Sequence, residues 1–313
     1  MLAYLQLVRL PTVFTAMADI FLGFVLTHVF LIGPDGWNHP AKFFGLLASS
    51  CCLYLAGMVF NDVFDRAQDA KERPTRPIPS GRVSLRSAVI LGTVLMIAGL
   101  ISAAFVTWIS LQVAGLLVVA ILAYDAVLKR TILGPVAMGT CRSLNLLLGA
   151  SDQTQWIPPG LLDGLQILIA AGLGIYIVGV TVFARTEAHI SSRRQLGLAQ
   201  FLFSLGIVVL GIQIAKETTW SWPLSGDGPT ALAMLGVVGF TLNRRAVAAL
   251  IDPSPANVQL TVKSLLLSYV ILDATMVFWR LNSMAGPYPA AHALATAALV
   301  IPALLLSRLI PMT

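Results

Sequence analysis

The sequence predicts an all-α polytopic membrane protein, a bundle of nine to ten transmembrane helices. Of its 313 residues, 57% are hydrophobic and 11% are charged, whereas a soluble domain carries about 25% charged residues. Long apolar stretches also recur along the whole chain, separated by short polar breaks. Because lipid offers the backbone no hydrogen bonds, stretches of this length form helices rather than barrel strands. We expect a single integral-membrane domain over residues 1–313.

Each apolar stretch is long enough to cross about 30 Å of hydrocarbon as a helix. The breaks between the stretches are too short to hold a separate soluble domain. The expected spans are 10–32, 42–65, 85–107, 110–128, 132–150, 161–186, 195–215, 228–248, 257–280 and 288–309.

The basic residues predict the orientation of these spans. Most of the 20 Lys and Arg residues lie in alternate connections, such as those after the second, fourth and sixth spans. Basic connections stay in the cytoplasm, so we expect a cytoplasmic N-terminus and a multi-pass protein of the bacterial inner membrane. The net charge of +6 therefore reflects topology, and we expect no nucleic-acid partner.

The densest polar segment ends the second span and combines Asn61, Asp62, Asp65 and Asp69. Spacings of three and four residues place these side chains on one face of a helix. Carboxylates crowded at a membrane surface need a counter-charge, and Mg²⁺ meets that need with one or two carboxylates plus phosphate oxygens. The alternative is a solvated helix end whose acids pair with neighbouring basic residues such as Arg66.

A basic, proline-rich loop follows this helix and contains Arg76 within Arg-Pro-Ile-Pro-Ser-Gly. Its prolines and Gly81 end the helix and favour an ordered loop, and Ser84 is placed to cap the third span. Basic side chains beside a metal site suit a phosphate-bearing substrate. A loop that only sets topology would explain the charge but not the proline content.

These motifs resemble the UbiA superfamily of intramembrane prenyltransferases. Asn-Asp-x-x-Asp-x-x-x-Asp followed by the proline-rich loop is similar to its first aspartate-rich motif. Tyr124 to Thr131 resembles the Tyr-x-x-x-x-Lys-Arg-Thr stretch at the end of the fourth span, and Asn145 and Gly149 resemble an Asn-x-x-x-Gly segment. The resemblance implies about nine helices around a central cavity open to lipid. Within it, Mg²⁺ would bridge two aspartate-rich motifs and the diphosphate of an allylic isoprenyl donor, and the ionised donor would alkylate a small, often aromatic, acceptor.

The resemblance also implies roles for individual residues. Asp65, Tyr124 and Lys129 would be catalytic, and Arg76, Arg130, Arg142, Asn145 and Arg185 would bind substrate, with Asn61, Asp62, Asp65, Asp69 and Glu187 as metal ligands. Other readings stay open: Lys129 and Arg130 as an ordinary topology signal, and Asn145 as a contact between helices.

The second aspartate-rich motif of the family is incomplete in this chain. The matching segment after the sixth span contains Ala-Arg-Thr-Glu-Ala, in which Glu187 is the one acid and no second acid follows four residues later. Glu187 is expected to bind metal or to pair with Arg185, and Arg185 to contact diphosphate oxygens. This form is similar to a branch that includes the EboC-like proteins.

Two other functions fit parts of the sequence. Intramembrane acids such as Asp19 and Asp273, together with weak internal repeats, are also found in secondary transporters. However, transporter ion sites lie near the bilayer midplane, whereas the acids at the end of the second span lie at one surface, beside the basic loop. The incomplete second motif would also suit a catalytically degenerate family member. We expect the prenyltransferase, with membrane lipid around it.

Overall fold

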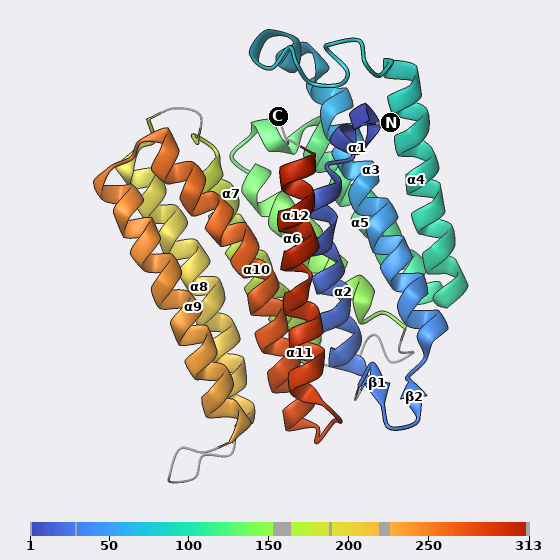
Figure 1. Cartoon of the computed structure of the whole chain (residues 1–313), viewed down its shortest axis with the longest axis vertical. Helices are drawn as coiled ribbons and strands as arrows, with labels where there is room; N and C mark the ends of the chain where they lie inside the picture. Colours follow the sequence, from blue (N-terminus) through green and yellow to red (C-terminus); the bar gives the residue numbers. More distant parts are fainter. Residues whose placement is uncertain (1, 29, 153–163, 188–189, 219–225, 311–313) are drawn as a thin grey trace.

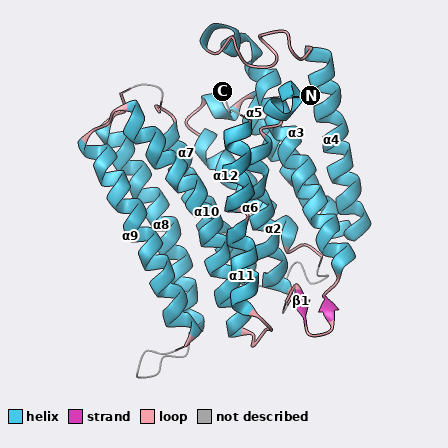
Figure 2. Ribbon diagram, viewed as in Figure 1, coloured by secondary structure: helices cyan, strands magenta, loops and turns pink. Residues whose placement is uncertain are grey.

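The computed structural model describes residues 2–28, 30–152, 164–187, 190–218 and 226–310. These residues form a bundle of long, roughly parallel helices with one small β-hairpin at one end (Figures 1 and 2). The N-terminus and the last helix lie at the opposite end of the bundle from the hairpin. The expected all-α membrane bundle is confirmed.

The first half of the chain contains the short helices and the hairpin. In the hairpin, Ile32 pairs with Trp37 and Gly33 with Gly36. The elements are α1 (Leu2–Leu7), η1 (Leu10–Thr12), α2 (Val13–Thr27), β1 (Ile32–Gly33), β2 (Gly36–Trp37), α3 (Pro40–Glu72), α4 (Leu85–Val106), α5 (Trp108–Ala126), η2 (Leu128–Arg130) and α6 (Gly134–Gly149).

Among the described residues, the second half of the chain contains four long helices followed by two helices of ten residues each. The elements are α7 (Leu165–Ala184), α8 (Arg193–Glu217), α9 (Asp227–Ile251), α10 (Pro255–Ser283), α11 (Pro289–Ala298) and α12 (Val300–Leu309). Pro302 stands four residues after Ala298 and cannot donate to its carbonyl, which accounts for the break between α11 and α12.

Local sequence signals explain where several helices begin. Pro40, Pro135 and Pro255 occupy first-turn positions, where the missing N–H is not needed. Ser84 caps α4 by accepting a hydrogen bond from the Ser87 N–H, as its place in the sequence predicts. Thr107 caps α5 in the same way.

Nine helices in the described part of the chain are long and apolar enough to cross a membrane. The helix α6 is outside this group because it has 16 residues and contains polar side chains. It nevertheless runs the length of α5: it begins just after η2, and beyond its end the Ser151 hydroxyl lies 2.8 Å from that of Ser110 in the first turn of α5. Nine apolar spans and this shorter tenth helix match the expected number.

The helices α2 and α10 form the centre of the bundle, while α4, α9 and α11–α12 lie outside. Trp279, Tyr176 and Tyr269 are among the largest side chains fully buried in the core. Apolar side chains such as Phe105 and Phe240 are exposed on the outer helices. An apolar outer surface is what a helix bundle presents to lipid, and the chain is an integral, multi-pass membrane protein.

Candidate active site

A cavity of about 770 Å³ opens between α2, α3, α5, α6, α7 and α10. Polar side chains line it near the ends of α3 and α5, and apolar side chains line it deeper in the bundle. The polar lining includes Arg9, Asn61, Asp65, Asp69, Arg73, Arg76, Asp125 and Glu187, and the apolar lining includes Leu117, Ile121, Met138, Ile177, Val180, Val262 and Leu266. A pocket of this size suits a small-molecule ligand.

The Asp65 carboxylate is held by two cations from the segment after α5. Lys129 Nζ lies 2.8 Å from Asp65 Oδ2, and Arg130 Nη2 lies 3.3 Å from Asp65 Oδ1. The Lys129 ammonium is largely buried, whereas most of the Arg130 guanidinium is exposed. These pairs bring the two basic residues of the Tyr-x-x-x-x-Lys-Arg-Thr stretch to the first acidic motif. Neither cation lines the cavity directly.

Asp62 and Asp69 share a buried arginine. Arg76 Nη1 lies 2.7 Å from Asp69 Oδ2 and 3.4 Å from Asp62 Oδ1. Asp62 also accepts a hydrogen bond of 2.9 Å from Arg9 Nη2. Asp69 lines the cavity, whereas Asp62, predicted on the same face, does not, because a one-residue offset from Asn61 turns a helical side chain by about 100°. The proline-rich loop is thus fixed on the acidic motif through Arg76.

Asn61 connects the first acidic motif to α5. Its Nδ2 donates a hydrogen bond of 2.9 Å to Oδ1 of Asp125, which is buried. Tyr124 lies next to Asp125 in the chain and lines the same cavity. The helices α3 and α5 therefore present amide, phenol and carboxylate groups to one space.

The segment after α7 adds one carboxylate and no second acid. Glu187 lines the cavity and is half-buried, and this burial raises its pKa while the positive charge of Arg73 opposes the shift. Arg185 does not line the cavity in the structure and donates a hydrogen bond to the carbonyl of Thr131. The alternative role of Glu187, an ion pair with Arg185, is absent from the described contacts.

Arg142 and Asn145 lie deeper, on the inner wall of the cavity. Asn145 donates hydrogen bonds to the Ala16 carbonyl at 3.0 Å and to Asp19 Oδ2 at 2.8 Å. It therefore makes the contact between helices that was its alternative role, and it also faces the cavity. Arg142 Nη1 lies 3.3 Å from Asp19 Oδ2.

The chemistry of the cavity mouth suits a hard cation. Its ligands would be carboxylate and amide oxygens, which Mg²⁺ and Ca²⁺ prefer. Among the residues that the structure describes, no three His, Cys, Asp or Glu side chains converge on one point as a complete metal site. One or two carboxylates plus substrate oxygens are enough for Mg²⁺, so the donor set fits a metal that binds together with a phosphate.

Several polar residues that line the cavity were not among the sequence candidates, including Arg9, Asp125 and Arg73. Arg9 reaches Asp62 across 53 positions of the chain and lines the cavity. It adopts a left-handed backbone conformation with φ 46° between α1 and η1. Asp125 follows Tyr124 in the motif. An acid near the end of an apolar span was the available signal for Asp125, and Arg9 gave none beyond its charge.

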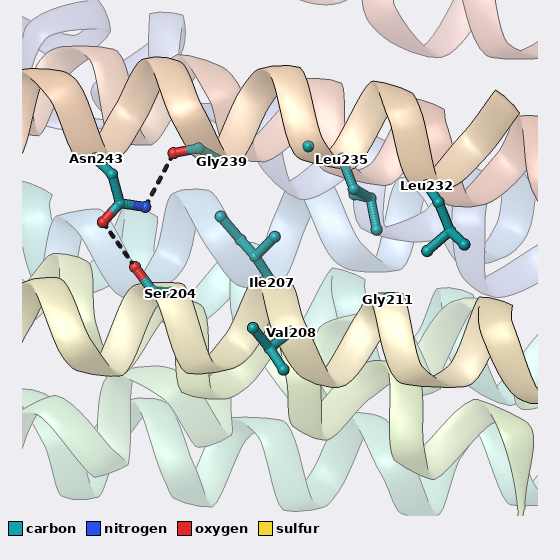
Figure 3. A pocket seen from close by; sticks show the side chains of 9 residues that line it. Ser204, Ile207, Val208, Gly211, Leu232, Leu235, Gly239 and Asn243 are labelled. Atoms are coloured by element: carbon teal, nitrogen blue, oxygen red, sulfur yellow. Dashed lines mark hydrogen bonds between the residues drawn. The ribbon is translucent and has the colours of Figure 1, made fainter. Parts of the chain in front are cut away.

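A second, smaller hollow of about 270 Å³ lies between α8 and α9, away from the acidic residues. Figure 3 shows Asn243 at one end of it, bonded to Ser204 and to the Gly239 carbonyl. Ile207 and Leu235 also line this hollow, which is almost entirely apolar. It contains no titratable side chain, so the candidate site is the larger cavity.

The fold and the motif residues define a member of a family of intramembrane enzymes. The family model for "UbiA prenyltransferase family" matches residues 21–309. The chain belongs to the UbiA prenyltransferase family, and the resemblance of its motifs is confirmed.

The chain is similar to synthases of one name from several organisms. The digeranylgeranylglyceryl phosphate synthase of Metallosphaera sedula is 34% identical over 163 residues, which is 50% of this chain and 55% of that protein. The synthase of the same name from Sulfurisphaera tokodaii is 26% identical over 221 residues, 70% of this chain and 72% of that protein. The match thus spans about half the length of the first of these relatives.

Solved structures share the fold at low identity. A UbiA homolog from Archaeoglobus fulgidus bound to GPP and Mg²⁺ has a TM-score of 0.62 and 16% identity, covering 95% of this chain and 99% of that chain. A UbiA homolog from Aeropyrum pernix K1 has a TM-score of 0.61 and 17% identity, covering 84% and 97%. These likenesses show that the helix arrangement is that of the family.

Proposed function

We propose that this protein is a Mg²⁺-dependent intramembrane prenyltransferase. It transfers an isoprenyl group from an allylic isoprenyl diphosphate to a small-molecule acceptor and releases diphosphate. The observation that carries the proposal is one cavity with two chemically distinct ends. Carboxylates and cations gather at its mouth, and apolar side chains line its inner part. The polar mouth suits a metal diphosphate, and the apolar part suits an isoprenoid chain.

Asp65, Asp69 and Glu187 are the predicted metal-binding acids that line the cavity, and Glu72 and Asp125 line it as well. Asn61 lines the cavity beside them, and Asp62 does not line it but contacts Arg76, which does. Bound Mg²⁺ supplies charge stabilisation for the departing diphosphate. The catalytic assignments of Asp65, Lys129 and Tyr124 belong to the same proposal.

When the acids coordinate the metal, the basic residues that now pair with them would bind the phosphate oxygens of the donor. Lys129 and Arg130 already lie on Asp65, so they are within reach of a diphosphate bound there. Arg76 is fixed on Asp69 at the same mouth. Cations held in place before the substrate arrives stabilise a developing negative charge without reorganisation. Arg185 is a weaker candidate because its guanidinium is turned to Thr131.

The apolar inner wall has two tasks in this proposal. It binds the isoprenoid chain, and it keeps water away from the allylic carbocation. Leu117, Ile177 and Leu266 are among the side chains that would do this. The family relationship favours this activity over the secondary transporter.

The acceptor is a separate question. An aromatic acceptor stays a prediction, and the similar synthases are named for a glyceryl phosphate product, which contains no aromatic ring. We therefore propose a small acceptor that enters the same cavity, and test both chemistries.

We also propose that the cavity mouth faces the cytoplasm of a bacterial inner membrane. The basic loop with Arg73 and Arg76 lies at the mouth, as does the Lys129–Arg130 pair, and basic connections favour the cytoplasmic side. Labelling of a single introduced cysteine at Arg86 in intact cells and in inverted vesicles tests this orientation.

The activity is tested with the purified full-length protein in nanodiscs. Geranylgeranyl diphosphate is supplied with Mg²⁺ or with EDTA, and a glyceryl ether phosphate or 4-hydroxybenzoate serves as acceptor. We expect a prenylated product and released diphosphate with Mg²⁺ only. Donor binding without product from either acceptor would favour the catalytically degenerate member, and no donor binding would contradict the proposal.

A further inference from the structure

A polar cluster lies inside the bundle on the wall of the cavity, below the acidic mouth. Arg142 of α6 is its centre, with Asp19 of α2 behind it. The guanidinium carbon lies 4.7 Å from the ring centroid of Tyr269 and 5.8 Å from that of Tyr54. Stacking of this kind holds the plane of a guanidinium in place. Four helices, α2, α3, α6 and α10, thus fix one arginine at membrane depth.

The Arg142 guanidinium has hydrogen-bond donors without partners. It carries five N–H groups, yet in the described part of the chain it makes no hydrogen bond with good geometry. Its Nη1 is buried without a hydrogen bond and has the Asp19 ion pair at 3.3 Å as its polar contact. The residue is only 8% exposed, and it lines the cavity. Because Nη1 is enclosed, a ligand in the cavity would reach the remaining N–H groups of the guanidinium, and a buried donor left without a partner costs free energy unless a ligand satisfies it.

The charge of the cluster limits what that ligand can be. Asp19 accepts hydrogen bonds from Tyr269 at 2.6 Å and from Asn145 at 2.8 Å. The Asp273 carboxyl is fully buried and has no hydrogen bond among the described residues. A carboxylate without hydrogen bonds is far more costly to bury than one with two, so the negative charge belongs on Asp19. Asp19 and Arg142 then form a neutral pair, and the ligand needs an oxygen but no charge.

The position of Arg142 points to the acceptor rather than the donor diphosphate. Tyr54, on which the guanidinium stacks, stands seven residues before Asn61 on α3. At 1.5 Å per residue this is about 10 Å deeper along the helix axis. Asp65 and its two cations lie further still toward the mouth. An oxygen bound at Arg142 would therefore lie on the inner side of a diphosphate held at the acidic motif.

We propose that Arg142 is the acceptor subsite, and that its unpartnered N–H groups bind the hydroxyl oxygen of an alcohol or a phenol. This inference deepens the proposed function and depends on it, because it names the acceptor chemistry of the same cavity. Tyr54 and Tyr269 flank the subsite, and Asp19 is a positioning residue that holds the guanidinium in place.

The test measures hydroxyl recognition by direct binding, without turnover. Full-length protein in nanodiscs is titrated with two matched probe pairs, with and without saturating farnesyl S-thiolodiphosphate and Mg²⁺. The phenol pair is 4-nonylphenol and 4-nonylanisole, and the alcohol pair is 1-O-hexadecylglycerol and its dimethyl ether. We expect the wild type to bind at least one hydroxyl probe about tenfold more tightly than its ether, the effect of one hydrogen bond.

The Arg142→Gln variant is expected to lose this preference while it keeps its affinity for the donor analogue. The double variant Asp19→Asn/Arg142→Gln, which leaves no unpaired charge, keeps the test valid where the single variant fails to fold. Arg86→Gln, an exposed arginine on α4, is the matched control and should bind like the wild type. Preference for the phenol alone or the alcohol alone identifies the acceptor class.

Other outcomes separate the two proposals. A wild type that binds every hydroxyl probe and its ether equally would overturn the Arg142 subsite, whether or not the donor analogue binds. A preference that survives in both Arg142 variants would also overturn it. Loss of donor-analogue binding in the wild type would instead contradict the proposed prenyltransferase, and hydroxyl preference would still be read from the titration without analogue.

Discussion

Lys129 Nζ lies 2.8 Å from Asp65 Oδ2, which joins the end of α3 to the turn after α5 at the mouth of the cavity. The ammonium is about nine-tenths buried. A buried cation of this kind is costly unless it is paired. The pair therefore keeps the Asp65 carboxylate and the Lys129 ammonium at the mouth. There, a bound metal would take the carboxylate and a diphosphate would take the ammonium.

Lys129→Gln should weaken binding of an isoprenyl diphosphate, because the variant loses a cation at the mouth of the site. We expect an increase of about tenfold or more in Kd, since a charged hydrogen bond contributes about 1.5–3 kcal/mol. Titration with radiolabelled geranylgeranyl diphosphate measures it. Lys71→Gln, which removes an exposed lysine from the end of α3, is the control. An equal increase in Kd in both variants would mean that Lys129 acts only through the overall positive charge of the protein and not through a direct contact with the diphosphate.

Arg76→Gln should destabilise the fold, because Arg76 is the shared partner of Asp62 and Asp69. Removing one member of a buried ion pair costs about 3–5 kcal/mol. A fall in the thermal unfolding midpoint in detergent measures this effect. Arg86→Gln should leave the midpoint unchanged. If the Arg76 variant unfolded at the wild-type temperature, the loop would not be anchored by these pairs.

Gly23→Ala should disturb the contact between α2 and α6. A Cβ at Gly23 would lie 2.2 Å from the Leu146 carbonyl oxygen. Because this oxygen belongs to the backbone, no side-chain movement can relieve the clash. The helices must then separate, which shifts Asp19 away from Arg142. We expect a lower unfolding temperature, whereas Gly115→Ala, where nothing lies within 4 Å of the added carbon, should be neutral or stabilising by about 0.5–1 kcal/mol. An equal change in unfolding temperature in the two variants would contradict the close contact between α2 and α6 at Gly23.

Glu187→Gln should change the pH dependence of stability in EDTA. Burial raises the pKa of Glu187 above its ordinary value of 4.5. The folded protein then holds this proton more tightly than the unfolded chain, so the stabilisation is present below pH 4.5 and is lost as pH rises through the folded pKa. The half-exposed carboxyl limits the effect to under about 1 kcal/mol.

Unfolding curves of the wild type and of Glu187→Gln are measured in parallel from pH 4 to pH 8. The wild type should lose stability relative to the glutamine variant as pH rises, because glutamine does not ionise. A constant difference between the two curves would mean that folding does not raise the pKa of Glu187.

The helices could be predicted from hydropathy because lipid leaves the backbone no other way to pair its polar groups. The α6 helix was predicted as an ordinary span, yet it has 16 residues and contains Arg142 and Asn145. Periodicity predicted Asn61, Asp62, Asp65 and Asp69 on one helix face; Asn61, Asp65 and Asp69 line the cavity, whereas Asp62 does not.

The sequence could not predict which charged side chains pair with one another. Arg9 reaches Asp62 only because α1 and η1 turn back onto α3, and helical periodicity does not describe that turn. Arg185 was expected to face the substrate, and the carbonyl of Thr131 holds it elsewhere. Both cases depend on contacts between segments more than 50 positions apart in the chain.

The most direct test of the account is Mg²⁺-dependent binding of geranylgeranyl diphosphate to the wild type and to Asp65→Asn. Asp35→Asn, in the turn of the β-hairpin at the far end of the bundle, is the control. We predict tight binding with Mg²⁺, weak binding with EDTA, and loss of the Mg²⁺ effect in Asp65→Asn alone. Equal binding by all three proteins, with or without Mg²⁺, would contradict the assignment of this cavity as the donor site.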